Sequence, residues 1–560
     1  MSEELIFEVA PRQDTRSAME RRSRALRPLL LLIPAIVLTG AFLLVPLVAT
    51  IVISLTGWGT HYRDVIADPE VRHALRNSIG WLAFAPLVCL GGLVLARTRR
   101  DRRASFPWLL AAPVAASALV SGITFRLVFD PSGARGTVNA LLGAVTGTEI
   151  PFLGTGWIWV VLSCAFVWQW AGLAIVVFRA VGEPSRDRLR QALVPAGTLA
   201  LAVMFVVTGR IFDLVVIAAP GSMQDRVDVA GLHWWRAQIG LGSGGTAALA
   251  VLTSLVVGGA VLACVWARSH CWFTGDLERP HQNSSWRPPP RGGGRSWAIR
   301  LLGVLVAAVW TLPLVVLALT SVHTPSAAAI SGWWRGGLGF GSYRQAFDSG
   351  ELMDALINTA GRALAAAILL VLVAVPAAYA LARGDLPRPA GRLLIGAAVA
   401  LAVIPPQAVI LPLGTAFQRL HLLGAHTSLI MVHVAFGIPP AVMLLRNAFI
   451  RVPREVVLAR QRAPGSTPAL LAAAALSWPV VLTVGVLEFI LVWNDFVIGL
   501  LLGGFEAGQI TLVLFEESRE FATSSGVLAA EAVVSLVIPL ALVLATGRWL
   551  LRGLAEGTRR

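Results

Sequence analysis

An all-α polytopic membrane protein, with about 12 transmembrane helices in two parallel-repeat halves of six, is the fold class that the sequence predicts. The first observation is composition: 56% of the 560 residues are hydrophobic and 14% are charged, which is typical of an integral membrane protein. The second is the recurrence of apolar runs of about 20 residues, the length that crosses a bilayer. The third is charge placement. All 46 Lys-plus-Arg positions are arginines, and they gather in alternate connections between the runs, which is the positive-inside pattern. The formal charge of +15 therefore indicates topology and not binding to nucleic acid.

The apolar runs also define the domain boundaries. An N-terminal arm at 1–28 precedes a first half at 29–266, a linker rich in Pro and Gly at 267–297 leads to a second half at 298–548, and a tail follows at 549–560. Arginines place the arm, the linker and the tail in the cytoplasm, so both termini are expected inside the plasma membrane of a bacterium. The first apolar run is too long for the core of a signal peptide, so it is expected to stay as a span. The spans are expected at 29–54, 78–96, 106–127, 156–179, a fifth that ends near 210, 245–266, 298–320, 357–382, 393–416, 427–445, 478–502 and 527–548.

A direct repeat indicates that the two halves share one orientation. Tyr62-Arg63 precedes Asn77-Ser78, and Tyr343-Arg344 precedes Asn358-Thr359 at the same spacing. Both copies are expected outside, directly before the second span of their half, with each asparagine capping the helix that it precedes. Duplication of a unit of six spans explains such a repeat. Trp234-Trp235, in an outer loop, is predicted to lie at the membrane interface.

The chain contains no lysine. A phosphate-binding Walker loop requires one, so ATP must be bound by a partner subunit, and no cofactor is expected in this chain. The four cysteines lie in or beside apolar runs and imply no disulfide framework. Cys264, His270, Cys271 and His281 match no standard zinc spacing, so no metal site is predicted.

An interruption at 446–479 separates two apolar runs near the C-terminus. Pro453 suits the first turn of a helix, Glu455 lies where the helix dipole favours an anion, and Ala463-Pro464-Gly465 ends the helix. This pattern predicts a short basic helix at the cytoplasmic surface, followed by a second helical run over 469–476. The alternative is a loop that only anchors the topology with its arginines.

Short motifs follow one another in a fixed order along both halves. They are Phe129-Asp130-Pro131, Asn139-Ala140-Leu141-Leu142, Val167-Trp168-Gln169-Trp170, Phe212-Asp213-Leu214, Ala377-Ala378-Tyr379-Ala380-Leu381-Ala382-Arg383, Ile404-Pro405-Pro406, Leu411-Pro412-Leu413, Trp493-Asn494-Asp495-Phe496 and Arg552-Gly553-Leu554. This ordered set resembles the membrane subunits of binding-protein-dependent ABC importers, the carbohydrate-uptake (maltose-type) permeases. Two permease subunits of that family are expected to be fused in this chain.

The resemblance implies a permease, not an enzyme, that carries a small molecule, a sugar, across the lipid bilayer. Its partners would be two copies of a cytoplasmic ABC ATPase subunit and an extracytoplasmic solute-binding protein. The interruption near the C-terminus resembles the family's EAA loop, which docks into a cleft of the ATPase, although Leu458, Arg460 and Ala463 depart from that pattern. The residues expected to couple this chain to the ATPase are Pro453, Glu455, Val456, Val457, Ala459 and Gly465.

The corresponding loop of the first half is about a dozen residues too short for the same motif. Its coupling helix is expected to be missing or reduced to one turn around Pro184, Arg186 and Arg188. Two interpretations stay open. Transport runs with one full coupling contact and one reduced contact, or the chain is a degenerate paralogue with impaired transport.

Candidates for the translocation path are Phe212, Asp213, Glu488, Trp493, Asn494 and Asp495. A proton-coupled secondary transporter is the rival function, because carboxylates inside spans mark proton paths. Asp213, Glu488, Asp495 and Glu531 are the groups that such a path would use. The ordered motifs and the direct repeat favour the importer. The sequence does not identify the substrate.

Overall fold

The computed structural model describes residues 29–98, 112–180, 189–209, 211–273, 297–384, 386–462, 468–504 and 507–558. Within these ranges the regular structure is helical, apart from one isolated antiparallel bridge between His323 and Leu338. Eight of the described helices are long and apolar enough to cross a membrane, or up to ten if each of two bent pairs is counted as one span. The all-α polytopic prediction is confirmed, whereas the number of twelve spans stays a prediction.

The first half begins with a helical stretch over Leu29–Ala67, which contains a π-helical turn, η1, and a 3-10 turn, η2. Its elements are η1 (Gly40–Leu44), α2 (Val45–Leu55), η2 (Thr56–Gly59), α3 (Thr60–Ala67), α4 (Pro69–Thr98), η3 (Ala112–Ala115), α6 (Ala118–Val128), α7 (Thr137–Thr146), α8 (Ile158–Ala180), α9 (Leu189–Gly209), α10 (Phe212–Ala218), α11 (Gly221–Gln224), α12 (Ala230–Arg236) and α13 (Gln238–Phe273).

The second half also consists of long helices that alternate with short ones, although the short helices between them differ from those of the first half. Its elements are α14 (Trp297–Ser321), α15 (Pro325–Ser331), α16 (Gly341–Asp348), α17 (Glu351–Arg383), α18 (Arg388–Leu401), α19 (Gln407–Arg419), α20 (His426–Arg451), α21 (Arg454–Arg462), α22 (Ala469–Leu476), α23 (Trp478–Trp493), η5 (Gly499–Gly503), α24 (Ile510–Ser518) and α25 (Phe521–Thr558).

Several predicted spans are broken, and those predictions are corrected here. The span expected at 393–416 is divided into α18 and α19, because Pro405-Pro406 has no backbone N–H groups for a helix and disfavours helical conformation just before it. The described part of the span expected at 106–127 is a 3-10 turn followed by α6, whose N-terminus is capped by Ser117. The span expected at 478–502 ends as an α-helix at Trp493. In the first half, α9 and α10 meet at a bend of 51°.

The internal repeat persists in three dimensions. In the first half α4 packs on α8 and α9, and in the second half α17 packs on α20 and α23 in the same way. The repeated tyrosines make the same contact in both copies. The hydroxyls of Ser54 and Tyr62 lie 2.8 Å apart, and those of Ser321 and Tyr343 also lie 2.8 Å apart. Each bond joins the C-terminal end of a half's first span to a short helix that precedes the second span, so the internal repeat is a real structural repeat.

The asparagines of the repeat do not cap helices, contrary to the prediction. Asn77 and Asn358 lie inside α4 and α17, because both helices begin before the apolar run. The hydroxyl residues that follow them have the capping role for other helices. Ser78 Oγ accepts the backbone N–H of Ala230, the first residue of α12 (2.9 Å), and Thr359 Oγ1 accepts that of Ile510, the first residue of α24 (3.1 Å). The repeat motif therefore ties the second span of each half to a short helix that precedes its last span.

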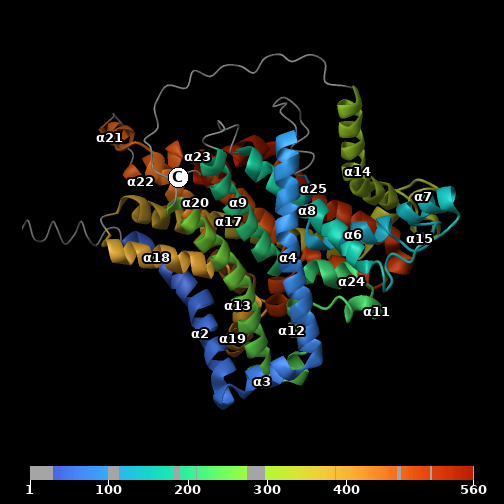
Figure 1. The fold of residues 1–560 in the computed structure, drawn as a ribbon, viewed down its shortest axis with the longest axis horizontal. Coiled ribbons are helices and arrows are strands. Elements are labelled where there is room, and N and C mark those ends of the chain that lie inside the picture. Colours follow the sequence, from blue (N-terminus) through green and yellow to red (C-terminus); the bar gives the residue numbers. More distant parts are fainter. Residues whose placement is uncertain are drawn as a thin grey trace, which may run out of the picture.

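The first helix of each half packs against the other half. Leu32 and Ala35 belong to a buried cluster whose other members all come from the second half, and α2 contacts α19. Reciprocally, α14 of the second half contacts α6 of the first. Figure 1 shows α2 beside α18 and α19 at one side of the molecule and α14 above α6 and α15 at the other. The two halves are therefore interlocked.

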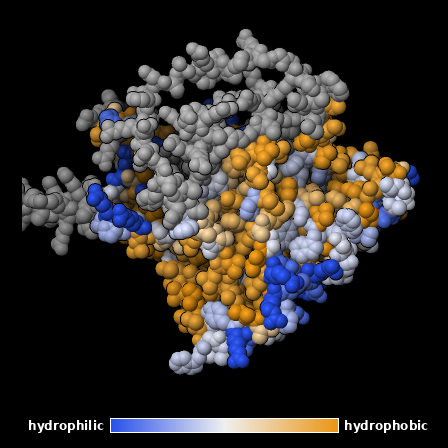
Figure 2. All heavy atoms as spheres, viewed as in Figure 1, coloured by the Kyte–Doolittle hydropathy of each residue, from blue (hydrophilic) through white to orange (hydrophobic). Residues whose placement is uncertain are grey.

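The surface of the bundle is apolar over a broad area. Figure 2 shows hydrophobic residues across the middle of one face and hydrophilic residues gathered toward its lower edges. Exposed apolar side chains on two of these helices are Val45, Val48 and Val52 of α2 and Val304, Leu305 and Val309 of α14. Soluble proteins rarely expose patches of this size, so lipid is expected to cover them. The chain is a multi-pass membrane protein.

Candidate translocation path and coupling helix

An aromatic cluster joins the two halves where their broken helices meet. Phe212, directly after the break between α9 and α10, stacks on Phe496, directly after the end of α23, with ring centres 5.8 Å apart and an interplanar angle of 18°. Trp235 of α12 lies 5.7 Å from Phe212, and Phe515 of α24 lies 5.2 Å from Phe496. We call these four residues the aromatic cluster. Each half contributes two rings from equivalent places.

The position of Trp235 corrects the prediction that Trp234-Trp235 lies at the membrane interface. Trp234 is 1% exposed, and its indole N–H donates to the carbonyl of Thr246 at 3.1 Å. Trp235 packs in the aromatic cluster. Trp234 is therefore part of the interior, and Trp235 is half-buried against the other rings of the cluster.

The predicted Trp-Asn-Asp residues shape the break after α23. Trp493 is buried and donates to the carbonyl of Ser535 (2.9 Å). Asn494 donates across the interface to the carbonyl of Ala115 in the broken third span of the first half (3.1 Å). Asp495 accepts the backbone N–H of Gly499 (2.9 Å), so its side chain holds the turn that follows. The structure therefore places these three residues around the break, with Asn494 reaching the other half.

The two remaining path candidates lie apart from each other. Glu488 of α23 is 4% exposed and packs against Gly437 of α20. A Cβ atom added to Gly437 would lie 2.5 Å from a carboxylate oxygen of Glu488. His433, one turn before that glycine, lies 3.9 Å from Asp495. Glu488 is thus enclosed within the second half. Asp213 lies half-buried in the first turn of α10, next to the aromatic cluster in sequence.

An arginine adds a second contact between the halves. Arg126 of α6 donates to the carbonyls of Ile217 in its own half (3.2 Å) and Ser518 in the other (3.3 Å). Its guanidinium lies over the ring of Phe521, 4.0 Å from the ring centre. Such contacts between a cation and an aromatic face are favourable when they are shielded from water. Arg126 therefore helps to hold the two halves together.

A buried histidine–carboxylate pair joins α12 to the residues directly before it. Nδ1 of His233 and a carboxylate oxygen of Asp228 are 2.9 Å apart, and Asn77 of α4 donates to the backbone carbonyl of Asp228 (2.8 Å). The hydrogen bond to Asp228 raises the pKa of His233, although burial acts in the opposite direction. The pair joins the second span of the first half to the helix that carries Trp235.

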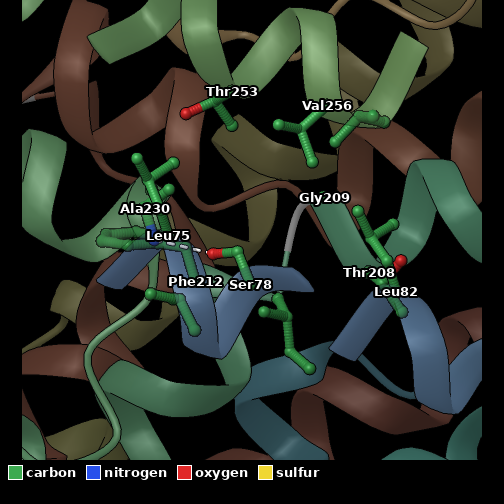
Figure 3. Close-up of a pocket in the computed structure, with 13 residues that line it drawn as sticks. Leu75, Ser78, Leu82, Thr208, Gly209, Phe212, Ala230, Thr253 and Val256 are labelled. Atoms are coloured by element: carbon green, nitrogen blue, oxygen red, sulfur yellow. Dashed lines mark hydrogen bonds between the residues drawn. The ribbon is translucent and has the colours of Figure 1, made fainter. Parts of the chain in front are cut away.

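Two small cavities lie beside the residues predicted to line the path. A cavity between α4, α10, α12 and α13, shown in Figure 3, has a volume of about 10 Å³, and Ser78, Phe212 and Ala230 are among its lining residues. A second cavity of about 10 Å³ lies between the halves beside Asp130 and Ser525. Each has room for about one water molecule. Neither of these two cavities has room for a solute the size of a sugar.

The predicted coupling helix is present as α21. It begins after Pro453 and extends over Arg454–Arg462, and α22 follows at Ala469–Leu476, as the pattern of local signals predicts. Figure 1 shows both at an edge of the molecule, at the end opposite α3. The guanidinium of Arg383, at the end of α17, donates to the carbonyls of Phe449 and Val452 at the end of α20. This contact fixes the base from which α21 projects.

The predicted coupling residues face different surroundings. Val457 is 7% exposed, so it packs inside the chain rather than pointing toward a partner. Val456 is 41% exposed and Leu458 is 45% exposed. Pro453, Glu455 and Ala459 are also exposed. The accessible apolar pair is therefore Val456 and Leu458, and Val457 anchors the helix.

Some predicted coupling residues lie outside the described part of the chain. Gly465 follows the described end of α21, and Pro184, Arg186 and Arg188 fall between α8 and α9, which end and begin at Ala180 and Leu189. Their roles stay predictions. In the described part of the chain, no three His, Cys, Asp or Glu residues are grouped closely enough to hold a metal ion.

Two buried amides contact the breaks; the sequence analysis named Gln169 only as part of the Val167–Trp170 motif and did not name Gln407. Gln169 of α8 donates to the carbonyl of Ala116 (3.0 Å), and Gln407 is the first residue of α19. Both are 3% exposed, and the side-chain oxygen of each has no hydrogen-bond partner among the described residues. The available signal was a polar residue inside an apolar span, which is costly in a membrane and often functional.

These features define a class of protein. Two repeated helical halves meet at an interface of broken spans, and a short helix projects from one end. Such a chain is a membrane permease.

Comparison with known proteins defines the family. No protein-family model matches the chain. The chain is 30% identical over 224 residues to the trehalose transport system permease protein SugB of Mycobacterium tuberculosis, which covers 39% of this chain and 81% of that protein. It is 27% identical over 273 residues to the osmoprotective compounds uptake permease protein GgtD of Synechocystis, covering 46% and 91%. The sulfoquinovosyl glycerol transport system permease protein SmoH of Agrobacterium fabrum is 28% identical over 266 residues, covering 46% and 90%. The chain belongs to the family of ABC transporter permease proteins.

A solved ABC transporter involved in the import of the acidic polysaccharide alginate is also similar, at 15% identity and a TM-score of 0.40, covering 45% of this chain and 99% of that one.

Family membership decides between the functions that the sequence left open. The chain is a transmembrane permease component of an ABC importer, and not an enzyme or a proton-coupled secondary transporter. Each relative described above covers less than half of this chain but most of its own length, which agrees with two permeases fused in one chain. Permeases of ABC importers work with an ATPase subunit and a substrate-binding protein in general, so these are the partner classes of this chain.

Proposed function

We propose that this chain supplies both permease units of a sugar importer in the cell membrane of a bacterium. Both termini and the linker at 267–297 lie in the cytoplasm, a solute-binding protein delivers the sugar from outside, and two copies of a separate subunit bind and hydrolyse ATP. The chain itself holds no cofactor. The observation that supports the proposal is the aromatic cluster, where Phe212 and Phe496 from equivalent breaks of the two halves stack on each other.

A sugar is the substrate class that best fits this path and the relatives. The transport systems of the relatives are named for trehalose, osmoprotective compounds and sulfoquinovosyl glycerol. Sugars offer an apolar C–H face that packs on aromatic rings and hydroxyl groups that both donate and accept hydrogen bonds. Phe212 and Phe496 supply the rings, and buried amides lie beside the breaks.

A chain of direct contacts leads from α21 to the aromatic cluster. Arg383 joins the end of α17 to the base of α21. Within α17, Thr359 holds the first residue of α24, and α24 carries Phe515 of the cluster. We propose that closure of the ATPase moves α21, and that α17 transmits this movement to α24 and separates the rings. Contiguous packed elements of this kind can carry energetic coupling between sites.

The coupling is proposed to be unequal between the halves. In the second half Val456 and Leu458 present an apolar contact on α21, whereas the short loop of the first half offers Pro184, Arg186 and Arg188. Exposed ion pairs contribute about 0–1 kcal/mol each, which is less than the burial of apolar side chains contributes. Transport is expected to be retained, with α21 as the main coupling contact.

Uptake into proteoliposomes tests the proposal. The chain is reconstituted with the ATPase subunit and the solute-binding protein of the same genome, and uptake of radiolabelled trehalose is measured. Uptake should require both partners and ATP, should persist when a protonophore collapses the proton gradient, and should be lost with an ATPase variant that cannot hydrolyse ATP. Uptake that needs a proton gradient but no ATP would contradict the proposal, as would ATP hydrolysis by the purified chain alone.

Single cysteines in a cysteine-free variant test the orientation. Positions 62 and 343 should react with a membrane-impermeant thiol reagent in intact cells, and position 288 should react only after the cells are opened. Reaction of position 288 in intact cells would show that the orientation is wrong.

A further inference from the structure

Gln407 extends from the second half into the first. It is the first residue of α19, directly after the break at Ile404-Pro405-Pro406. A Cβ atom added to Gly231 of α12 would stand 3.1 Å from the side-chain nitrogen of Gln407 and 3.4 Å from Cβ of Phe212. The amide therefore lies next to Gly231, which also borders Cβ of Phe212, at the interface between the halves.

This amide is not satisfied in this structure. Gln407 is 3% exposed, and its side-chain oxygen has no hydrogen-bond partner among the described residues. A buried polar group without a partner destabilises the state that contains it. An apolar side chain of the same size would fill this place without that cost. Gln407 therefore fits a role in another state of the transporter better than a role in packing.

A second amide lies at another of the breaks. The nitrogen of Gln169 donates to the carbonyl of Ala116, and its oxygen, like that of Gln407, has no partner among the described residues. Asn494 donates to the neighbouring carbonyl of Ala115. The side chains of Gln169 and Asn494 and the carbonyls of Ala116 and Ala115 are uncharged polar groups. Groups of this kind suit the hydroxyls of a neutral solute.

We propose that Gln407 is a specificity-determining residue of the translocation path. When the halves separate, its amide donates to and accepts from a hydroxyl group of a neutral polyhydroxylated solute, whose apolar C–H face packs on the ring of Phe212. A site that hydrogen-bonds a substrate hydroxyl in this way discriminates strongly against solutes that lack it, because the buried amide would stay unpaired. This inference rests on the proposed function and assigns the recognition of hydroxyl groups to a named side chain.

The test replaces Gln407 by methionine, which has a similar length and no hydrogen-bonding amide. Gln418→Met is the matched control, because Gln418 is exposed near the other end of the same helix. Trehalose uptake and ATP hydrolysis are measured together in proteoliposomes with both partners. Q407M should lower the trehalose transported per ATP about tenfold, which corresponds to about 1.4 kcal/mol, while the binding protein still stimulates ATP hydrolysis. The thermal unfolding midpoint should not fall, and Q418M should behave as wild type.

Other results would overturn the inference. Unchanged transport by Q407M would show that the amide does not contact the solute. A drop in transport with an equal drop in ATP hydrolysis and in the unfolding midpoint would show a packing role. Gln407→Glu keeps the shape and should also lower transport, because a carboxylate offers no donor. Failure of both variants to accumulate in the membrane would show that the fold needs the amide. If wild type itself shows no ATP-dependent uptake, the proposed function fails rather than this inference alone.

Discussion

The proposed docking surface of α21, Val456 and Leu458, gives a prediction whose size follows from the exposure of these side chains. We expect the double substitution of Val456 and Leu458 by alanine to weaken binding of the ATPase subunit. Alanine removes two carbon atoms from Val456 and three from Leu458, and each buried carbon contributes about 0.8 kcal/mol. Val456 is 41% exposed and Leu458 is 45% exposed, so covering the remaining surface contributes about 0.7 kcal/mol at Val456 and about 1.1 kcal/mol at Leu458 through the atoms that alanine lacks. Together this is about 1.8 kcal/mol, or about 20-fold in Kd.

Val457→Ala is the matched control on the same helix. Val457 is 7% exposed and packs inside the chain, so removing the equivalent of two buried methylene groups should cost about 1.6 kcal/mol of folding stability. Its Kd for the ATPase should change less than about threefold, because the side chain does not reach the partner. Binding is measured by titrating the ATPase subunit into the detergent-solubilised chain. The reasoning would be refuted if Val457→Ala weakened binding as much as the double substitution, or if the double substitution bound normally.

Three further predictions concern the repeat, pH and the base of α21. Ser78→Ala and Thr359→Ala each remove the acceptor for a backbone N–H and should each lower the free energy of unfolding by about 1–3 kcal/mol, measured by thermal unfolding in detergent. The pKa of His233 is raised in the folded state. Its pairing with Asp228 therefore stabilises the fold fully at pH values below about 6.5, the ordinary pKa of histidine, and this stabilisation is lost as the pH rises through the pKa of the folded state. His233→Gln should therefore flatten the pH dependence of the unfolding midpoint across that interval. Arg383→Leu should release the carbonyls at the base of α21 and lower uptake per ATP hydrolysed while the chain still reaches the membrane.

Each of these predictions has a result that contradicts it. Unchanged unfolding in either hydroxyl variant would mean that water replaces the lost acceptor. An unfolding midpoint that depends on pH equally in wild type and in His233→Gln would place the pH dependence elsewhere. Normal coupling in Arg383→Leu would show that α21 needs no fixed base.

Local signals predicted the coupling region well. Pro453 and Glu455 mark a helix start in a few residues of sequence, and α21 and α22 lie where these signals place them. Caps, prolines and dipole-matched charges act within one or two turns, so a single sequence contains what is needed. The orientation of Val456 and Val457 was not predictable, because it depends on the side of α21 that packs on the rest of the chain.

Hydropathy located the spans but not their breaks or their ends. The run at 393–416 is apolar apart from Gln407 and Thr415, and Pro405-Pro406 nevertheless divides it. Asn77 appeared to precede its helix because hydropathy detects only the part of a helix that crosses the lipid, and α4 begins at Pro69. In the first case one apolar run contains two helices, and in the second case one helix is longer than its apolar run.

Contacts between the halves could not be predicted from the sequence. Phe212 and Phe496 belong to motifs that the sequence showed, but their stacking depends on how two bundles meet. The role of Gln407 depends on the same interface between the halves, because Gly231 and Phe212, which lie near it, belong to the other half. Local patterns carry no information about such distant pairs.

The interlocked first helix has a consequence for biosynthesis. Leu32 and Ala35 are synthesised early, yet the other members of their buried cluster begin at Ala346, which is 311 positions after Ala35 (346 − 35). At roughly 5–20 residues per second, about 15–60 s pass before these partners emerge from the ribosome. During that time lipid or an insertion factor must cover the surface that the second half later buries. Fusion of the two halves ensures that the matching partner then arrives on the same chain, in a fixed ratio and at a high effective concentration.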